Sequence, residues 1–145
     1  MQIRKAEKKD ISQIVVIAKE EFGIDAWTEN QFLSELEESN RIFLVAEDNG
    51  EILGYLTTMT LIDEMEILDI AVKNEHKRKH IASSLFDELL RKYAVDIKKF
   101  FLEIAEDNFI AHKLYEKYNF KNIAVRKNYY KSGKNAIIMQ RKVDE

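Results

Sequence analysis

Residues 64–90 read EMEILDIAVKNEHKRKHIASSLFDELL, and the order of segments in this stretch decides the fold. The first segment, EMEILDIAV, carries apolar residues at both alternate sets of positions, which is typical of a central strand covered on both faces. The last segment repeats apolar residues at helical spacing from Ile81 and predicts an amphipathic helix of about 15 residues. A basic loop, HKRKH, separates the two. One set of strand positions holds Leu68, Ile70 and Val72, and the other holds Ile67 and Ala71.

A strand, a basic loop and a helix in this order favour the binding of an anion such as a pyrophosphate. The first helical turn offers N–H groups without intrahelical partners, and the helix dipole adds partial positive charge. Lys77, Arg78 and Lys79 can close around the anion. The alternative is a solvated turn that holds no ligand, since exposed charge runs are common.

The segments on either side predict an α/β fold with a mixed sheet. Asn49-Gly50 joins two strand-like runs and is a strong hairpin signal, because both turn positions require positive φ. Asp10, Thr28 and Asn108 are suitable helix N-caps. Strands are expected near residues 3–6, 41–48, 51–62, 64–72, 99–104, 123–129 and 136–142, and helices near residues 11–22, 29–38, 81–95 and 108–118.

Composition limits the kinds of protein that the chain can be. Its 145 residues, 46% hydrophobic and 34% charged, suit one soluble domain over residues 1–145. A net charge of −3 lacks the basic excess of a nucleic-acid binder. The chain has no Cys, and its three His residues lack metal-ligand company, so we expect no cysteine nucleophile and no metal site. Without an apolar leader or a membrane-length run, the expected location is cytoplasmic.

The strand, loop and helix resemble the cofactor-binding motif of the GNAT superfamily of acetyl-CoA-dependent N-acetyltransferases, and the similarity covers essentially the whole chain. In that family an IAV-like strand end precedes a loop of Gln or Arg, two variable residues, Gly, any residue, and Gly or Ala. Lys77 stands here where Gln or Arg is usual, and His80 where Gly is usual. The Cβ of His80 disfavours positive φ and a close backbone approach, which predicts weaker cofactor binding or an outward-pointing His80.

The resemblance implies a GNAT fold, with a mixed, mostly antiparallel central sheet of about seven strands flanked by about four helices. It also implies that acetyl-CoA is the co-substrate, with its pantetheine arm beside the central strand. Backbone N–H groups near Ile70 to Val72 would polarise the thioester carbonyl. The residues implied to bind acetyl-CoA are Ile70, Ala71, Val72, Lys77, Arg78, Lys79, His80, Ile81, Ala82, Asn108 and Tyr115.

Residues 101–120, FLEIAEDNFIAHKLYEKYNF, resemble a second segment of the family, with Asn119 in place of its last Gly. Asn tolerates the left-handed conformation that a helix C-terminus favours. Three further segments are similar to the ribosomal-protein-alanine N-acetyltransferases, which acetylate the N-terminal alanine of a small-subunit ribosomal protein. These segments are Ala26-Trp27-Thr28, RKNYY at residues 126–130 and NAIIM at residues 135–139.

Two side chains are implied to carry the chemistry. Glu103 matches the family's catalytic Glu and is expected to accept a proton from the amine, directly or through water. Tyr115 is expected to protonate the departing thiolate, because an unperturbed Tyr pKa of about 10 keeps it protonated at neutral pH. The alternatives are an exposed strand Glu and a core Tyr. Asn108 can cap its helix and hydrogen-bond the cofactor together.

Acceptor selection is expected to come from Trp27, Glu66, Tyr129 and Tyr130. Aromatic rings with polar tips can wall a narrow channel, and Glu66 can attract a cationic N-terminus. The alternative for the two Tyr residues is an ordinary strand, since Tyr has high β propensity. Asp69 stays unassigned, because it either faces the amine pocket or pairs with a neighbouring Lys.

The sequence therefore predicts a monomeric enzyme that transfers acetyl from acetyl-CoA to a peptide or protein N-terminus by direct attack in a ternary complex. The expected acceptor is the N-terminal alanine of a ribosomal protein, with no membrane or nucleic-acid partner. Three alternatives stay open: another acceptor, such as other N-termini, a lysine side chain or a small amine; a CoA-binding module without turnover; and a nucleic-acid contact through HKRK, which the net negative charge disfavours.

Overall fold

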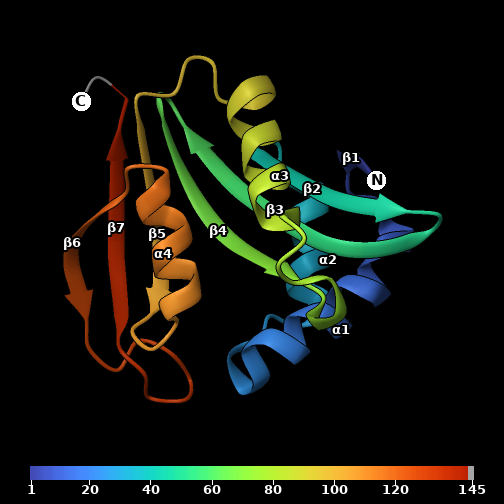
Figure 1. Cartoon of the computed structure of the whole chain (residues 1–145), viewed down its shortest axis with the longest axis horizontal. Coiled ribbons are helices and arrows are strands. Elements are labelled where there is room, and N and C mark those ends of the chain that lie inside the picture. The colour runs from blue at the N-terminus through green and yellow to red at the C-terminus, as the bar shows by residue number, and fades with distance from the viewer. Residues whose placement is uncertain (144–145) are drawn as a thin grey trace.

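The computed structural model describes residues 1–143, and these residues are organised around a seven-stranded sheet (Figure 1). The strand order is β1-β2-β3-β4-β5-β7-β6, and neighbouring strands are antiparallel except for the parallel pair β4 and β5. The predicted α/β class with a mixed, mostly antiparallel sheet is therefore confirmed. The strands are β1 (Gln2–Lys5), β2 (Arg41–Asp48), β3 (Glu51–Leu61), β4 (Glu64–Val72), β5 (Lys99–Ala105), β6 (Lys121–Arg126) and β7 (Ala136–Lys142).

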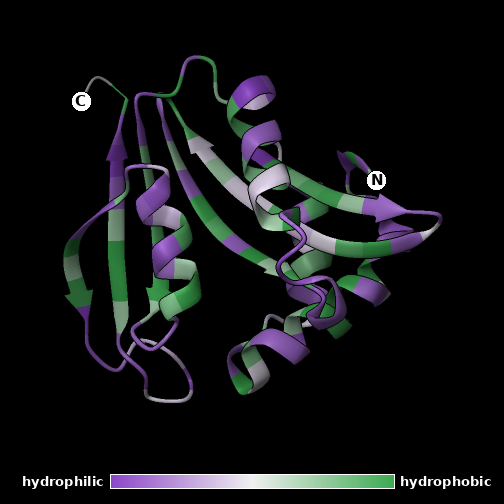
Figure 2. Ribbon diagram, in the orientation of Figure 1, coloured by the Kyte–Doolittle hydropathy of each residue, from purple (hydrophilic) through white to green (hydrophobic). Residues whose placement is uncertain are grey.

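Helices cover both faces of the sheet and bury a core on each side. The helices are α1 (Ile11–Phe22), α2 (Glu29–Glu37), α3 (Ile81–Glu88) and α4 (Phe109–Lys117), and α3 continues into a π-helical turn, Leu89–Tyr93. Apolar residues of α1 and α2 form one core with β2 and β3, and those of α3 form the other with β4 and β5. Figure 2 shows the sheet as largely hydrophobic, whereas the loop before α3 is hydrophilic. Within residues 1–143, no helix has the length and apolar character needed to span a membrane.

Most local signals of the sequence fold as predicted. Asp10 is the exception: it stands at the N-cap position of α1, but its side chain makes no capping hydrogen bond there and binds Arg4 and the Glu7 N–H instead. Asn49 and Gly50 both have positive φ, 51° and 85°, in the turn between β2 and β3. Thr28 and Gln31 form a reciprocal capping box at the start of α2. The Asn108 side chain caps α4 by accepting a hydrogen bond from the Ala111 N–H. Each such cap stabilises its helix by about 1 kcal/mol.

The strand predicted near residues 123–129 begins and ends earlier than expected, at Lys121–Arg126. β6 ends at Arg126, and residues 127–135 form the loop that leads to β7. Tyr129 and Tyr130 therefore lie in this loop, so their interpretation as ordinary strand residues is wrong. A turn at Asn128, with φ of 52°, explains why the strand stops, because positive φ is incompatible with the extended ladder.

A β-bulge at Leu68 changes which side chains of β4 share a face. Thr57 lies opposite Asp69 and Thr58 opposite Ile67, so Leu68 is an extra residue in β4. The bulge reverses the alternation beyond it. Ile67 therefore joins the same core as Val72, whereas Ala71 joins the other core, and the predicted grouping of Ile67 with Ala71 is wrong.

The parallel strands β4 and β5 stay together for only part of their length. Their pairing covers Glu64–Ile67 and Lys99–Leu102, and beyond it the strands diverge (Figure 1). Within residues 1–143, residues 68–72 consequently have no strand neighbour on the β5 side. This divergence opens the sheet at its centre and leaves room for a ligand between β4 and β5.

Candidate active site

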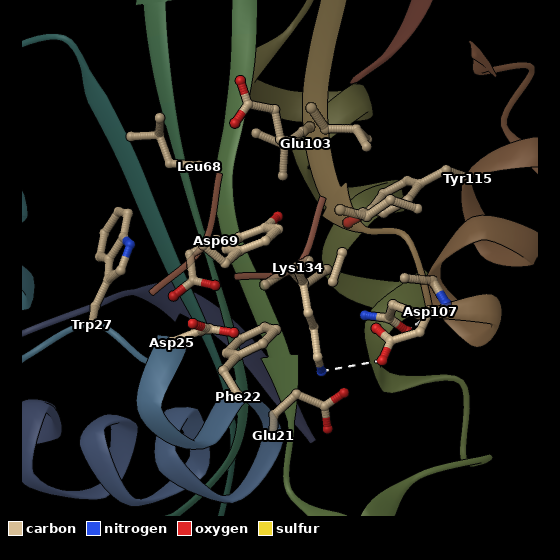
Figure 3. Close-up of a pocket in the computed structure, with 18 residues that line it drawn as sticks. Glu21, Phe22, Asp25, Trp27, Leu68, Asp69, Glu103, Asp107, Tyr115 and Lys134 are labelled. Atoms are coloured by element: carbon tan, nitrogen blue, oxygen red, sulfur yellow. Dashed lines mark hydrogen bonds and ion pairs between the residues drawn. The ribbon is translucent and has the colours of Figure 1, made fainter. Parts of the chain in front are cut away.

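A cavity of about 320 Å³ lies where β4 and β5 diverge (Figure 3). A smaller cavity of about 150 Å³ adjoins it and shares five of its lining residues: Trp27, Ile67, Leu68, Glu103 and Tyr130. The structure thus brings together both predicted catalytic residues and all four predicted acceptor residues. Those that line one or both cavities are Trp27, Glu66, Glu103, Tyr115, Tyr129 and Tyr130, joined by the predicted cofactor residues Ile70 and Asn108.

Glu103 projects from β5 into the junction of the two cavities. Its side chain is 19% exposed, and Arg126 Nη1 lies 3.5 Å from Glu103 Oε1. A hydrogen bond to the Glu103 carboxylate raises the pKa of the Tyr129 hydroxyl, and burial raises it further. Burial also raises the pKa of Glu66, with a further contribution from the negative charge of Glu103. The two carboxylates therefore make this end of the site attractive to a cation.

Tyr115 combines a core position with access to the cavity. It is 1% exposed, and its ring packs against Phe86 and Phe120 with centroid separations of 6.0 and 5.5 Å. Figure 3 shows it reaching from α4 to the cavity wall. Burial raises the pKa of the Tyr115 hydroxyl above its ordinary value, and the charge of Asp69 contributes. The hydroxyl is thus a proton donor at neutral pH.

Asp69 faces the cavity, which settles the question that the sequence left open. The Tyr55 hydroxyl donates a hydrogen bond of 2.8 Å to Asp69 Oδ2, and Tyr55 itself is fully buried. Burial raises the pKa of Asp69 to about 7, although the hydrogen bonds from Tyr55 and the Ile70 N–H oppose the rise. The signal that sequence reasoning lacked is the bulge at Leu68, which turns Asp69 toward Tyr55.

The phosphate loop, residues 77–82, adopts a conformation suited to an anion. Arg78 and His80 have positive φ, 68° and 62°, and His80 is the N-cap of α3. His80 therefore adopts positive φ although its Cβ disfavours that conformation. Its side chain is exposed, as expected for a residue that points outward. Ser84 donates hydrogen bonds to the His80 carbonyl through both N–H and Oγ, at 2.9 and 2.7 Å. These bonds fix the first turn of α3.

The N–H groups at the start of α3 fit a pyrophosphate, because the first turn of a helix leaves its donors unused. Gly54 lets β3 approach this turn closely: a Cβ there would lie 2.9 Å from the Ala71 carbonyl and 3.3 Å from Ile81 Cγ2. The unpaired edge of β4 supplies further backbone groups for a pantetheine amide. The donor set of this chain therefore suits coenzyme A.

The three loop cations differ in their surroundings. All three are exposed, but Lys77 forms an ion pair with Glu21 of α1. Their charges lie at the end of β4 and the start of α3, together with Ala71, Val72 and Ala82. Glu21 also lines the large cavity, so the loop and the cavity are directly linked.

Two long-range contacts cross the mouth of the cavity. Ser132 in the β6–β7 loop donates hydrogen bonds to Asp25 through N–H and Oγ, at 2.9 and 2.7 Å. Asp25 belongs to a short 3-10 helix, η2 (Gly23–Asp25), on the opposite rim. Lys134 of the same loop pairs with Asp107 at 3.1 Å (Figure 3). Sequence reasoning missed these residues because nothing local couples positions so far apart.

His76 lies close to two carboxylates that could share a metal ion with it, which the sequence did not indicate. Ligand atoms of His76, Glu51 and Glu75 lie within 4.8 Å of one another. Lys73 Nζ already binds Glu51 at 2.7 Å and neutralises that carboxylate. The cluster lies away from the residues that line the two cavities.

Known proteins are similar to this chain in sequence and in architecture. The model of the acetyltransferase (GNAT) family matches residues 9–120. An N-alpha-acetyltransferase of Saccharolobus solfataricus is 29% identical, over 96% of this chain and 91% of its own. A [ribosomal protein bS18]-alanine N-acetyltransferase of Haemophilus ducreyi is 33% identical, over 63% of this chain and 67% of its own.

A solved structure agrees with these relatives. The ribosomal-protein-S18-alanine N-acetyltransferase of Escherichia coli superposes with a TM-score of 0.88 at 25% identity, covering 98% of this chain and 93% of its own. The fold, the phosphate loop and the family match lead to one conclusion. The chain belongs to the acetyltransferase (GNAT) family and is an N-acetyltransferase.

Proposed function

We propose that this enzyme transfers the acetyl group of acetyl-CoA to the α-amine of a protein N-terminus, with the N-terminal alanine of a small-subunit ribosomal protein as its acceptor. The observation that carries the proposal is that Glu103 and Tyr115 line one cavity beside the open edge of β4. The names of the Haemophilus ducreyi and Saccharolobus solfataricus relatives support a protein N-terminus as the acceptor class.

Acetyl-CoA would bind with its pyrophosphate at the start of α3 and its pantetheine arm along β4. The N–H groups of Ile81 and Ala82, with Arg78 and Lys79, would hold the phosphates. Lys77 would join them once it leaves Glu21. The open backbone of Ile70 to Val72 would bond the pantetheine amides, and Asn108, which caps α4 at the cavity wall, would face the same arm.

The chemistry is a direct attack within a ternary complex. The chain contains no Cys to form an acetyl-enzyme thioester. Glu103 takes a proton from the ammonium, and the resulting amine attacks the thioester carbonyl, whose oxyanion is stabilised by backbone N–H groups near Ile70. The C–S bond then breaks, and Tyr115 donates its proton to the thiolate. A leaving thiol with a pKa of about 8.5 is readily protonated.

The rim of the site suits an extended, positively charged N-terminus. Glu66 and Glu103 attract the ammonium, while the rings of Trp27, Tyr129 and Tyr130 wall a narrow channel. The enzyme would act as a monomer, since the residues of the proposed site all come from one chain. We propose a cytoplasmic location for it.

The test is acetyl transfer from labelled acetyl-CoA to peptides that begin with Ala, Ser, Met or Asp. Glu103→Gln and Tyr115→Phe should each lower the rate by about 100-fold or more. Tyr118→Phe is the matched control, because Tyr118 lies on the C-terminal end of the same helix and donates to Asp87 instead.

Transfer to the Ala peptide with loss in both variants supports the acceptor and both roles. Transfer to another amine alone overturns the acceptor. Binding of acetyl-CoA with no transfer to any amine identifies a CoA-binding module.

A further inference from the structure

We infer that Asp69, held by the Tyr55 hydroxyl, is a second proton acceptor for the acceptor amine, beside Glu103. The inference rests on the proposed function. It starts from the cavity: Asp69 and Tyr115 line the same large cavity, and Asp69 comes from β4 while Glu103 comes from β5 (Figure 3). The two carboxylates thus approach a bound amine from the two strands that diverge around it.

The reaction needs two proton acceptors. An ammonium group gives up one proton before its nitrogen can attack and a second proton when the new N–C bond becomes an amide. The thiolate takes up one proton, from Tyr115, as the C–S bond breaks. Glu103 accepts one of the two protons that leave nitrogen. The other proton needs a second acceptor.

Asp69 is fixed for such a role by its neighbours. The Tyr55 hydroxyl donates to Oδ2 at 2.8 Å, and Tyr55 packs edge-on against Phe32, with ring centroids 5.3 Å apart, in a buried core. The Ile70 N–H also hydrogen-bonds the carboxylate, and Tyr55 does not use the second oxygen, Oδ1. Tyr55 is therefore a positioning residue, which orients a carboxylate whose other oxygen can meet the amine.

The charges around Asp69 make it a proton acceptor rather than half of a structural ion pair. The ion pairs within residues 1–143 do not include Asp69, and the cation of the cavity wall, Lys134, is paired with Asp107. Glu35, whose charge acts on Asp69, is paired with Arg41 at 2.7 Å. The groups that face or influence Asp69 are Tyr55 on β3, Glu21 on α1, Glu35 on α2, Tyr115 on α4, and Tyr130 in the β6–β7 loop.

These surroundings tune Asp69 to neutral pH. Its pKa is raised to about 7 by burial, with Glu21 and Glu35 adding to the rise. A base with a pKa near the working pH is more effective than an ordinary carboxylate. Asp69 lines the same cavity as Tyr115, whose hydroxyl must regain a proton after each turnover. A proton taken from nitrogen by Asp69 can therefore return, through the cavity, to the residue that gave one to sulfur.

The experiment compares the wild type, Asp69→Asn and Tyr55→Phe in the peptide assay. The kcat is measured at saturating acceptor from about pH 5.5 to 9, so that the range extends about one unit or more on each side of an inflection controlled by Asp69. Asp69→Asn keeps the shape and an oxygen for Tyr55. It should lower kcat by about 100-fold and remove the inflection, while the KM for acetyl-CoA stays within about twofold. Thermal unfolding checks that each variant is folded.

Tyr55→Phe gives the readout that a purely structural role would not change. The Tyr55 hydrogen bond lowers the pKa of Asp69, so its loss should move the inflection of kcat to higher pH. A kcat of Asp69→Asn within about threefold of the wild type, with the inflection unchanged, overturns the inference. If Asp69→Asn does not fold, the direction of the Tyr55→Phe shift decides. Failure of the wild type to acetylate any amine overturns the proposed function, and this inference with it.

Discussion

Lys77 of the phosphate loop is ion-paired with Glu21, a side chain of α1 that also lines the large cavity. The contact joins the start of α3 to the opposite layer of the molecule. It occupies one of the three cations that the loop offers to a pyrophosphate. The Glu21 carboxylate is therefore an internal competitor for the phosphate charge.

Glu21→Gln should tighten the binding of acetyl-CoA, because it releases Lys77 without changing the loop. A partly exposed ion pair is worth up to about 1 kcal/mol, so Kd should fall by about two- to fivefold. Lys77→Gln should weaken binding. Calorimetry with acetyl-CoA at low and high salt measures both effects, and the gain should shrink with salt.

Glu38→Gln is the control for Glu21→Gln, since it removes the same charge from an exposed position after α2. An equal gain in both variants would mean that net charge, rather than the release of Lys77, controls affinity.

His80→Gly should affect both stability and cofactor binding. His80 has φ of 62°, and a left-handed L-residue costs roughly 1–2 kcal/mol, partly offset by the entropy that Gly loses on folding. Urea unfolding should show a gain of about 0.5–1 kcal/mol, and calorimetry should show tighter acetyl-CoA binding.

Asn119→Gly separates the two effects of the His80 change. Asn119 has φ of 66° just after α4, away from the phosphate loop. It should leave acetyl-CoA affinity unchanged. Tighter binding in both variants would attribute the gain to general stability.

Much of the fold could be predicted because its signals are local. The Asn49-Gly50 hairpin, the Thr28 capping box and the doubly covered strand β4 each depend on a few adjacent residues. The bulge at Leu68 could not be predicted, since either register places apolar residues on both faces of β4. One extra residue reverses every side chain beyond it.

The residues of the candidate site also differ in whether the sequence could suggest them. Glu103 and Tyr115 are catalytic candidates only through the family resemblance, because a strand Glu and a helical Tyr have common structural explanations on their own. Asp69 required knowledge of the bulge and of Tyr55. The Glu21–Lys77 and Asp25–Ser132 contacts join residues far apart in sequence, and no periodic pattern couples their side chains.

Asp10 should make stability depend on pH in acid. It is 3% exposed and receives two hydrogen bonds from Arg4, at 2.8 and 2.9 Å. Burial alone would raise its pKa, but Arg4 and the Glu7 N–H outweigh burial and hold the pKa below the ordinary value of 3.8. A lowered folded pKa gives stability that is present above pH 3.8 and is lost as pH falls through the folded pKa.

Asp10→Asn should therefore lower the free energy of unfolding by about 1.5–3 kcal/mol at neutral pH, because it removes a charge-assisted pair and leaves the partly buried Arg4 with Glu47 as its main carboxylate partner. The difference from the wild type should stay constant down to about pH 5 and shrink below pH 4. Urea titrations across this range measure it. A difference that grows in acid would contradict the assignment. Lys8→Gln, which changes an exposed charge nearby, should show no such trend.

Ser132→Ala should weaken acceptor binding without changing cofactor binding. The Ser132 hydroxyl donates to Asp25 at 2.7 Å and holds the loop that carries Tyr129 and Tyr130 against the opposite rim. One hydrogen bond to a charged group contributes about 1.5–3 kcal/mol when buried and less at this exposed position. The loss should appear as a KM for the Ala peptide raised by about three- to tenfold, with the Kd of acetyl-CoA unchanged.

Ser12→Ala, at an exposed position of α1, should leave both constants unchanged. A lower kcat at unchanged KM would instead mean that the Ser132–Asp25 hydrogen bond positions the reacting groups, because only interactions stronger in the transition state than in the ground state alter kcat alone.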